Sequence, residues 1–150
     1  GAPAVQDALR SLLIRDLRVP GVYVHDREGD LVLVFDRGLF GAGQARIHAD
    51  SRAILRLLAK ALGEPDRRIQ VVVSGLTDPA PPRPADYRDN ESLALARAAA
   101  VVDFLLAASV PASRLTLRAA GDGPAPFAND TAEGRARNRS VMIRISILRG

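Results

Sequence analysis

The sequence predicts an α/β sandwich, in which helices pack on one or both faces of a mixed β-sheet. Segments with apolar residues at helical spacing alternate along the chain with short segments rich in β-branched residues. The segment 69–73 is apolar on both faces, as expected for a strand inside a covered sheet. A length of 150 residues suits one domain, and 47% apolar residues are enough for a core.

In the first half of the chain, the patterns predict a helix over 5–17, strands over 22–24 and 31–35, and a helix over 49–62. Pro20 and Gly21 end the first helix, and the turn-forming residues 26–30 join the two strands into a hairpin. Gly63 is placed to cap the second helix at its C-terminus.

The second half is expected to contain a strand over 69–73, a helix over 90–108, and strands over 115–117 and 141–148. Asn90 is the expected N-cap of the long helix. The residues 76–89 include four prolines and are expected to form a long ordered loop, and residues 121–133 form a second loop. Such loops often carry function.

Composition argues against most catalytic chemistry. The chain has no cysteine, which excludes disulfides, thiol nucleophiles and cysteine-ligated zinc. The two histidines, His25 and His48, are far apart in the predicted fold and lie in no nucleophile motif. We therefore expect a protein that is not an enzyme, with no metal site and no cofactor.

The net charge of +4 and the pI of about 10.5 raise the possibility of nucleic-acid binding. Arginine supplies 20 of the 21 basic residues, but these arginines are scattered and no aromatic residues are interleaved with them. A GC-rich genome explains such arginine usage, and no nucleic-acid partner is expected.

Polar residues gather where the predicted strands end, which is where ligands bind in α/β sheets. Thr77 and Asp78 follow the strand 69–73, Asn90 begins the long helix, and a polar segment over 129–139 precedes the last strand. Arg97 lies two turns after Asn90 among apolar neighbours, so its charge needs a partner, and Asp78 is the nearest candidate. Such a pair could either bind a zwitterion or clamp the loop to the helix.

These same residues resemble the OmpA-like peptidoglycan-binding family. The family pattern combines Gly-His-Thr-Asp, Asn-x-x-Leu-Ser-x-x-Arg-Ala and Asn-x-Thr-x-x-Gly-Arg-x-x-Asn-Arg-Arg, and this chain resembles it in order at 75–78, 90–98 and 129–139. The resemblance implies a two-layer sandwich with a βαβαββ core, preceded by an extra helix and strand. We thus expect an N-terminal extension over 1–30 and an OmpA-like domain over 31–150.

The resemblance also implies a function. It identifies a non-catalytic periplasmic anchor that binds the diaminopimelate of the peptidoglycan stem peptide. Its site residues would be Asp78 for the ligand ammonium, Arg97 for the ligand carboxylate, Thr77 and Asn90 for polar contacts, and Arg139 and Phe40 at the border. The protein would be tethered to the inner membrane through a segment absent from this chain, and could be a homodimer.

The long proline-rich gap and the segment 39–45 are similar to the branches of the family found in the flagellar stator (MotB) and in type VI secretion (TssL). The helix and hairpin over 5–35 favour the secretion branch, whose partners are other membrane-core subunits. The chain departs from the family pattern at Leu76, Ala94 and Ser140. These departures leave open an alternative, an assembly module of the secretion complex that has lost peptidoglycan binding.

Overall fold

The computed structural model describes residues 2–120 and 125–149. The elements are α1 (Ala2–Asp16), β1 (Val22–Arg27), β2 (Asp30–Phe35), α2 (Ala49–Leu62), β3 (Ile69–Gly75), α3 (Asn90–Ala107), η1 (Ala112–Arg114), β4 (Leu115–Ala119), α4 (Ala132–Asn138) and β5 (Val141–Ile147). Among these described residues, no helix is long and apolar enough to cross a membrane.

The five strands form one mixed sheet in the order β1-β2-β5-β3-β4. β5, the last strand in sequence, lies at its centre and pairs antiparallel with both β2 and β3. β3 and β4 are parallel because α3 crosses between them, whereas β1 and β2 form an antiparallel hairpin. The predicted order of strands and helices is therefore confirmed, with α1 and β1 preceding the βαβαββ core.

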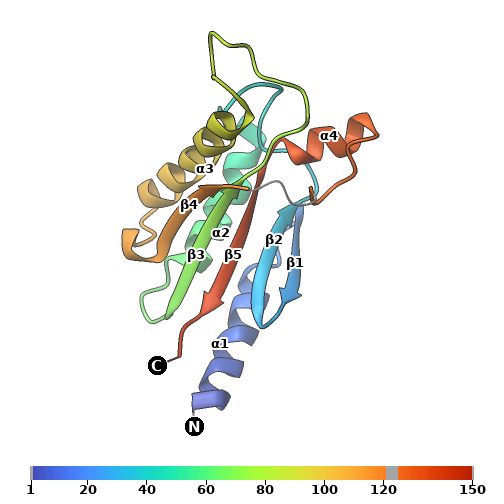
Figure 1. Cartoon of the computed structure of the whole chain (residues 1–150). Helices are drawn as coiled ribbons and strands as arrows, with labels where there is room; N and C mark the ends of the chain where they lie inside the picture. Colours follow the sequence, from blue (N-terminus) through green and yellow to red (C-terminus); the bar gives the residue numbers. More distant parts are fainter. Residues whose placement is uncertain (1, 121–124, 150) are drawn as a thin grey trace.

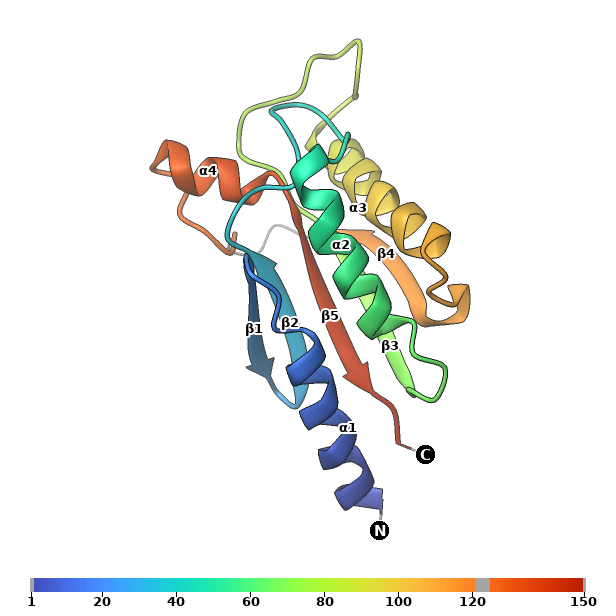
Figure 2. The same ribbon diagram turned by 180° about the vertical axis from the view of Figure 1, so that it is seen from behind.

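The helices α1, α2 and α3 all cover the same face of the sheet, so the domain has two layers (Figures 1 and 2). α4 is short and lies at one end of the sheet, beside the loop 76–89. The start of α1 and the end of β5 lie toward the opposite end. One end of the sheet thus collects the functional loops and the other end carries both chain termini.

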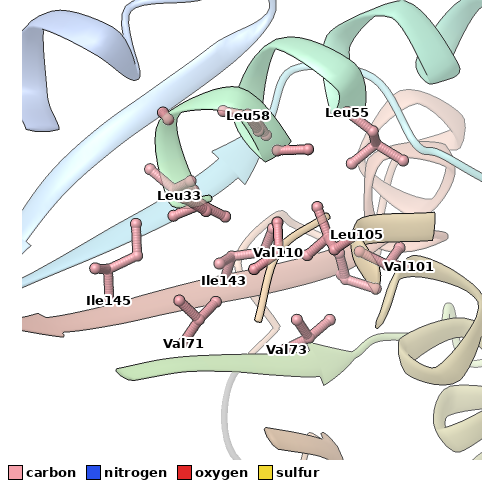
Figure 3. Close-up of a cluster of buried hydrophobic side chains, with 14 of the residues drawn as sticks. Leu33, Leu55, Leu58, Val71, Val73, Val101, Leu105, Val110, Ile143 and Ile145 are labelled. Atoms are coloured by element: carbon pink, nitrogen blue, oxygen red, sulfur yellow. The ribbon is translucent and has the colours of Figure 1, made fainter. Parts of the chain in front are cut away.

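The core lies between the two layers, where side chains of the inner sheet face meet the inward stripes of the helices. Figure 3 shows Val71, Val73 and Ile143 below the leucines of α2 and α3. Leu55 and Leu105 are both fully buried there. Because the side chains of a strand alternate, the odd-numbered residues of β3 and β5 reach this core.

Two sequence-based details are wrong or incomplete. Asp89, not Asn90, is the N-cap of α3, since its carboxylate accepts a hydrogen bond from the Ser92 N–H at 2.8 Å. This hydrogen bond is the main reason that the pKa of Asp89 lies below its usual value. The second predicted loop, over 121–133, ends in a helix, because α4 begins at Ala132. Residues 121–124 of that loop lie outside the described part of the chain.

The hairpin of β1 and β2 turns where the sequence indicated. Arg27 pairs with Asp30, so Glu28 and Gly29 alone make the connection. Both have positive φ, 54° and 90°, as a two-residue hairpin turn requires. Gly29 adopts this conformation without strain, which explains a glycine at the second turn position.

α1 is attached to the rest of the domain by apolar and ionic contacts. Leu13 and Leu17 are fully buried in the core. The carboxylate of Asp16, at the end of α1, pairs with the Arg67 guanidinium, which also donates to the Ala61 carbonyl at 2.6 Å. The hydrogen bond from Arg67 is the largest effect on the pKa of Asp16, which is lowered.

We expect Asp16→Asn to lower the free energy of unfolding by about 1 kcal/mol at pH 7, because it removes one partner of a partly buried ion pair. The pKa of Asp16 is lower in the folded protein than in the unfolded chain. The contribution of Asp16 is therefore complete above pH 4 and is lost as the pH falls through the folded-state pKa.

Urea denaturation of wild type and variant between pH 7 and pH 3 measures this effect. The difference in unfolding free energy should shrink toward zero at the acid end. The matched control is Asp103→Asn, since Asp103 is exposed on α3 and makes no ion pair within the described residues. An equal loss in both variants would contradict the assigned ion pair.

Candidate functional site

β3 ends and β5 begins at the same end of the sheet (Figure 1). The polar residues that the sequence predicted follow β3 or precede β5 there. Asp78 follows β3 by three residues and is 8% exposed. One of its carboxylate oxygens accepts a hydrogen bond from the Ala80 N–H at 3.0 Å. The other pairs with the Arg139 guanidinium at 2.8 Å.

The position of Asp78 depends on close packing of β3 against α3. Gly75 ends β3, and a Cβ atom placed on it would lie 1.7 Å from the Ala94 carbonyl oxygen. Only glycine allows this approach, so β3 reaches the first turns of α3 directly. The glycine that precedes Leu76-Thr77-Asp78 in the motif therefore has a packing role.

Arg139 is positioned by α4 and the loop before it. Thr131 caps α4 by accepting a hydrogen bond from the Gly134 N–H at 3.0 Å. The fully buried Asn138 donates to the Phe127 carbonyl and the Asn129 side chain, both at 2.8 Å, and accepts from the Phe127 N–H at 3.2 Å. Asn138 and Thr131 of the third motif thus hold this loop in place, whereas Asn129 also lines the hollow beside Asp78.

The backbone joins the site segments on either side of Arg139. The Phe40 N–H donates to the Arg139 carbonyl at 3.0 Å, and the Leu76 N–H donates to the Ser140 carbonyl at 3.0 Å. Residues 139–140 therefore lie between the loop after β2 and the loop after β3. This arrangement brings Phe40, Asp78 and Arg139 together, as the sequence predicted.

Arg97 is placed differently from the prediction. Its side chain is 1% exposed, and its guanidinium donates to three backbone carbonyls: Gln44 at 2.8 Å, Leu76 at 2.9 Å and Gly41 at 3.0 Å. Within the described residues it makes no ion pair, so the direct Asp78–Arg97 contact expected from the sequence is wrong. Asp78 pairs with Arg139 instead, because the carbonyls already satisfy Arg97.

The Phe40 ring covers the Arg97 guanidinium, with 5.4 Å from the central carbon to the ring centroid. Burial lowers the pKa of Arg97 to about 10, an effect that the nearby charge of Asp78 opposes and that of Arg139 reinforces. Arg97 therefore stays protonated at neutral pH. Two guanidiniums and one carboxylate give this cluster one net positive charge, which favours an anionic group in a ligand.

Two hollows open on either side of the Asp78–Arg139 ion pair. The Asp78 hollow, of about 730 Å³, is lined by Thr77, Asp78 and Asn90 among others. The Arg139 hollow, of about 930 Å³, is lined by Phe40 and Arg139 among others. Five of the six predicted site residues therefore line one of these two hollows, whereas Arg97 is not among the described residues that line either.

Asn90 is the first residue of α3 and borders the Asp78 hollow. Its Oδ1 atom is buried and has no hydrogen-bond partner in the described part of the chain. A buried acceptor without a partner costs free energy, so a donor from a ligand would stabilise it. An ammonium or amide N–H is the group that fits.

The three departures from the family pattern occupy buried positions. Leu76, Ala94 and Ser140 are 6%, 5% and 2% exposed. Leu76 and Ala94 form part of the wall of the Asp78 hollow. This wall is consequently more apolar than the family pattern implies.

Neither histidine belongs to the cluster, and both are exposed. His48 lines the Arg139 hollow at the start of α2. Among residues 2–120 and 125–149, no group of three histidine or acidic side chains is arranged to hold a metal ion. The geometry supports binding through charge and hydrogen bonds.

The fold and the cluster define a two-layer α/β binding domain with an acid–arginine pair at the carboxyl end of a central strand. The chain belongs to the OmpA family, whose model matches residues 39–139. Among curated proteins, motility protein B of Bacillus subtilis (strain 168) is 28% identical over 120 residues. That match covers 79% of this chain and 45% of the relative, so the chain spans less than half of that protein.

Solved structures show the same fold. The cell wall anchor of the type VI secretion system from Pseudomonas aeruginosa is 32% identical, with a TM-score of 0.72, and the match covers 93% of this chain and 97% of that one. A MotB-like protein from Desulfovibrio vulgaris has a TM-score of 0.82 at 23% identity, with 98% and 99% covered. The periplasmic domain of Helicobacter pylori MotB has a TM-score of 0.75 at 23% identity, with 87% and 82% covered. The predicted fold class and family are thereby confirmed.

We expect Asn138→Ala to lower the free energy of unfolding by about 3 kcal/mol, since it leaves the Phe127 backbone groups and the Asn129 side chain without their partner. Hydrogen exchange should accelerate over 125–140 more than in β3. The measurement is urea denaturation together with exchange followed by mass spectrometry.

Asp130→Ala is the matched control, because Asp130 is exposed in the same loop. It should change stability by less than about 0.5 kcal/mol. If the two variants exchanged alike over 125–140, Asn138 would not be the residue that holds the Arg139 segment.

Proposed function

We propose that this chain is a non-catalytic peptidoglycan-binding domain that anchors a cell-envelope machine to the cell wall. The ligand group is diaminopimelate in the stem peptide. The observation that carries the proposal is the Asp78–Arg139 ion pair, whose two side chains line different hollows, together with the buried charge of Arg97. Membership of the OmpA family and the likeness to a cell wall anchor support it.

Diaminopimelate presents an ammonium and a carboxylate on the same carbon. Its ammonium would pair with the Asp78 carboxylate and donate to Asn90 Oδ1. Its carboxylate would be attracted by the net positive charge of Asp78, Arg97 and Arg139 together. Thr77 would contribute polar contacts, and Phe40 would border the site. Each charge of the ligand thus has a partner of opposite sign.

The comparisons are consistent with two cell-envelope assemblies that this domain could anchor. The type VI secretion anchor of Pseudomonas aeruginosa is similar to this chain at 32% identity over nearly its whole length, which favours secretion. The match to motility protein B favours a stator anchor of the flagellar motor. In either setting the domain would be periplasmic, tethered to the inner membrane, with other membrane-core subunits as partners and a homodimer as one possible state.

Asp78→Asn should weaken the binding of meso-diaminopimelate at least tenfold, because the neutral amide removes the one carboxylate that pairs with an arginine of the cluster among residues 2–120 and 125–149. It should also reduce cosedimentation with purified peptidoglycan sacculi. Isothermal titration and sedimentation measure the two effects. The amide preserves the shape of the side chain, so the thermal midpoint checks that the fold is intact.

Asp86→Asn is the matched control, as Asp86 is an exposed carboxylate in the same loop, paired with Arg83. It should bind as wild type does. If wild type fails to sediment with sacculi, the peptidoglycan proposal is wrong and the alternative gains support. That alternative is an assembly module, favoured by the apolar wall that Leu76 and Ala94 form in the Asp78 hollow.

A further inference from the structure

We propose that the free edge of β4 and the adjoining flank of α3 form a docking site for an extended segment of a partner protein, which adds to the five-stranded sheet as a further strand. This surface lies on the side of the sheet opposite the β1–β2 hairpin. The proposal goes beyond cell-wall binding, because it concerns a protein partner. It rests on unpaired backbone groups, on exposed leucines and on one exposed arginine.

β4 is the last strand of the sheet, and within the described residues it pairs only with β3. Their ladder is parallel, so alternate residues of β4 bond to β3 with both backbone groups. The Ala120 N–H donates to the Gly75 carbonyl at 2.9 Å, which identifies the even-numbered residues as those that face β3. The backbone N–H and carbonyl groups of Leu115, Leu117 and Ala119 therefore point away from the sheet, where a further strand could bond to them.

Exposed leucines lie beside these backbone groups. Leu117 is in register with Val73 of the core, so its side chain points toward the helix layer, yet it is 39% exposed. On α3, Leu95 and Leu106 are 39% and 40% exposed. They lie on one flank of the helix, because their separation in sequence corresponds to about three turns. Leu95, Leu106 and Leu117 together are called the leucine strip below.

The flank of α3 that carries Leu95 and Leu106 faces away from α2. The other flank carries Phe104, whose ring lies under the guanidinium of Arg52 from α2, with 5.8 Å from the central carbon to the ring centroid. Figure 1 shows α3 behind β4 at the edge of the sheet, and the two elements pack on each other. The leucine strip is therefore apolar surface at the place where the sheet ends. A strand beside β4 would remove it from water.

The opposite edge of the sheet is protected against such pairing. The carboxylate of Asp26 in β1 is bonded by the guanidinium of Arg10 from α1, which also donates to the Gly29 carbonyl. Charged side chains on an edge strand discourage further pairing, because a partner strand would have to displace or bury them. β4 has one charged residue, Arg118, which forms no ion pair among residues 2–120 and 125–149. Of the two edges, β4 is thus the one that can accept a strand.

The surroundings of β4 define the chemistry of the segment that would bind. A strand directs alternate side chains to opposite faces, so those that face α3 must be apolar to cover the leucine strip. Arg118 follows Leu117 and lies on the outer face of the sheet, where it is exposed and borders the Asp78 hollow. An acidic side chain beside it would form a pair of opposite charges. The expected partner is therefore an extended segment in which aliphatic and acidic residues alternate.

The test uses a fluorescently labelled synthetic peptide in which valine and glutamate alternate and which is long enough to span β4. Its anisotropy should rise and saturate on titration with the wild-type chain. Two further copies carry N-methyl groups, one on the valine nitrogens and one on the glutamate nitrogens. The copy whose blocked nitrogens face β4 should bind at least tenfold more weakly, because it cannot donate to the carbonyls of the edge. A peptide with lysine in place of glutamate should also bind more weakly than the glutamate peptide.

Variants of the chain test the same surface. Leu117→Lys places a charge in the leucine strip and should weaken binding of the glutamate peptide at least tenfold. The matched control is Leu57→Lys, since Leu57 is 52% exposed on α2 and lies outside the strip. Arg118→Glu should reverse the preference between the glutamate and lysine peptides. In wild type, the Leu117 and Ala119 amides should exchange more slowly when the peptide is bound, and this measurement by NMR needs no variant.

The proposal is wrong if the glutamate peptide does not bind wild type, if neither methylated copy binds more weakly, or if Leu117→Lys and Leu57→Lys have equal effects. It is also wrong if a second copy of this chain already occupies the edge. Sedimentation equilibrium would then show a dimer that Leu117→Lys dissociates. Each of these outcomes is independent of peptidoglycan binding, which the Asp78→Asn variant tests.

Discussion

The site depends on one buried charge, the Arg97 guanidinium held by three backbone carbonyls. Burying a charge is costly unless hydrogen bonds compensate it, and here the carbonyls of Gly41, Gln44 and Leu76 do so. The buried guanidinium and the loops that supply these carbonyls depend on each other. The loops must approach Arg97 to satisfy it, and Arg97 in turn keeps the loops in place. Asp78 then becomes free to pair with Arg139 at the border of the hollows.

A second buried guanidinium that donates to backbone carbonyls lies at the other end of the sheet. Arg114 is 8% exposed and donates to the carbonyl of Leu62, the last residue of α2, and to those of Pro65 and Arg67 in the connection to β3. Arg67 donates to the Ala61 carbonyl and pairs with Asp16. Buried guanidiniums thus fasten irregular segments whose carbonyls no helix or strand satisfies. Some of the arginine excess in this chain has a structural explanation that its scattered pattern concealed.

Much of the fold follows from periodicity. The apolar pattern of β3, the hairpin turn at Glu28-Gly29 and the α2 boundaries were all predictable from local rules. α4 was not predicted, because it has seven residues and contains Gly134. That glycine is required by contact, since its Cβ would lie 1.7 Å from the Ala128 carbonyl oxygen. A cap signal at Thr131 was the one local indication of this helix.

The partners of the arginines could not be predicted for a similar reason. Sequence spacing showed that Arg97 needs compensation, and a carboxylate was the natural partner to expect. Whether backbone carbonyls compensate the charge in place of a carboxylate depends on how closely the loop 41–44 approaches α3. That distance is a property of the packed fold. Arg139 was predicted to line the site, and its pairing with Asp78 depends on the backbone hydrogen bonds of residues 139–140 to Phe40 and Leu76.

These backbone bonds also connect the site to the sheet by a short path. β5 begins two residues after Arg139 and lies at the centre of the sheet, bonded to β2 and β3 on its two sides. A force applied at Arg139 along the direction of β5 therefore acts in shear on ladders of hydrogen bonds that must break together. Arg139 thus combines a partly exposed charge with direct attachment to β5, the central strand of the sheet.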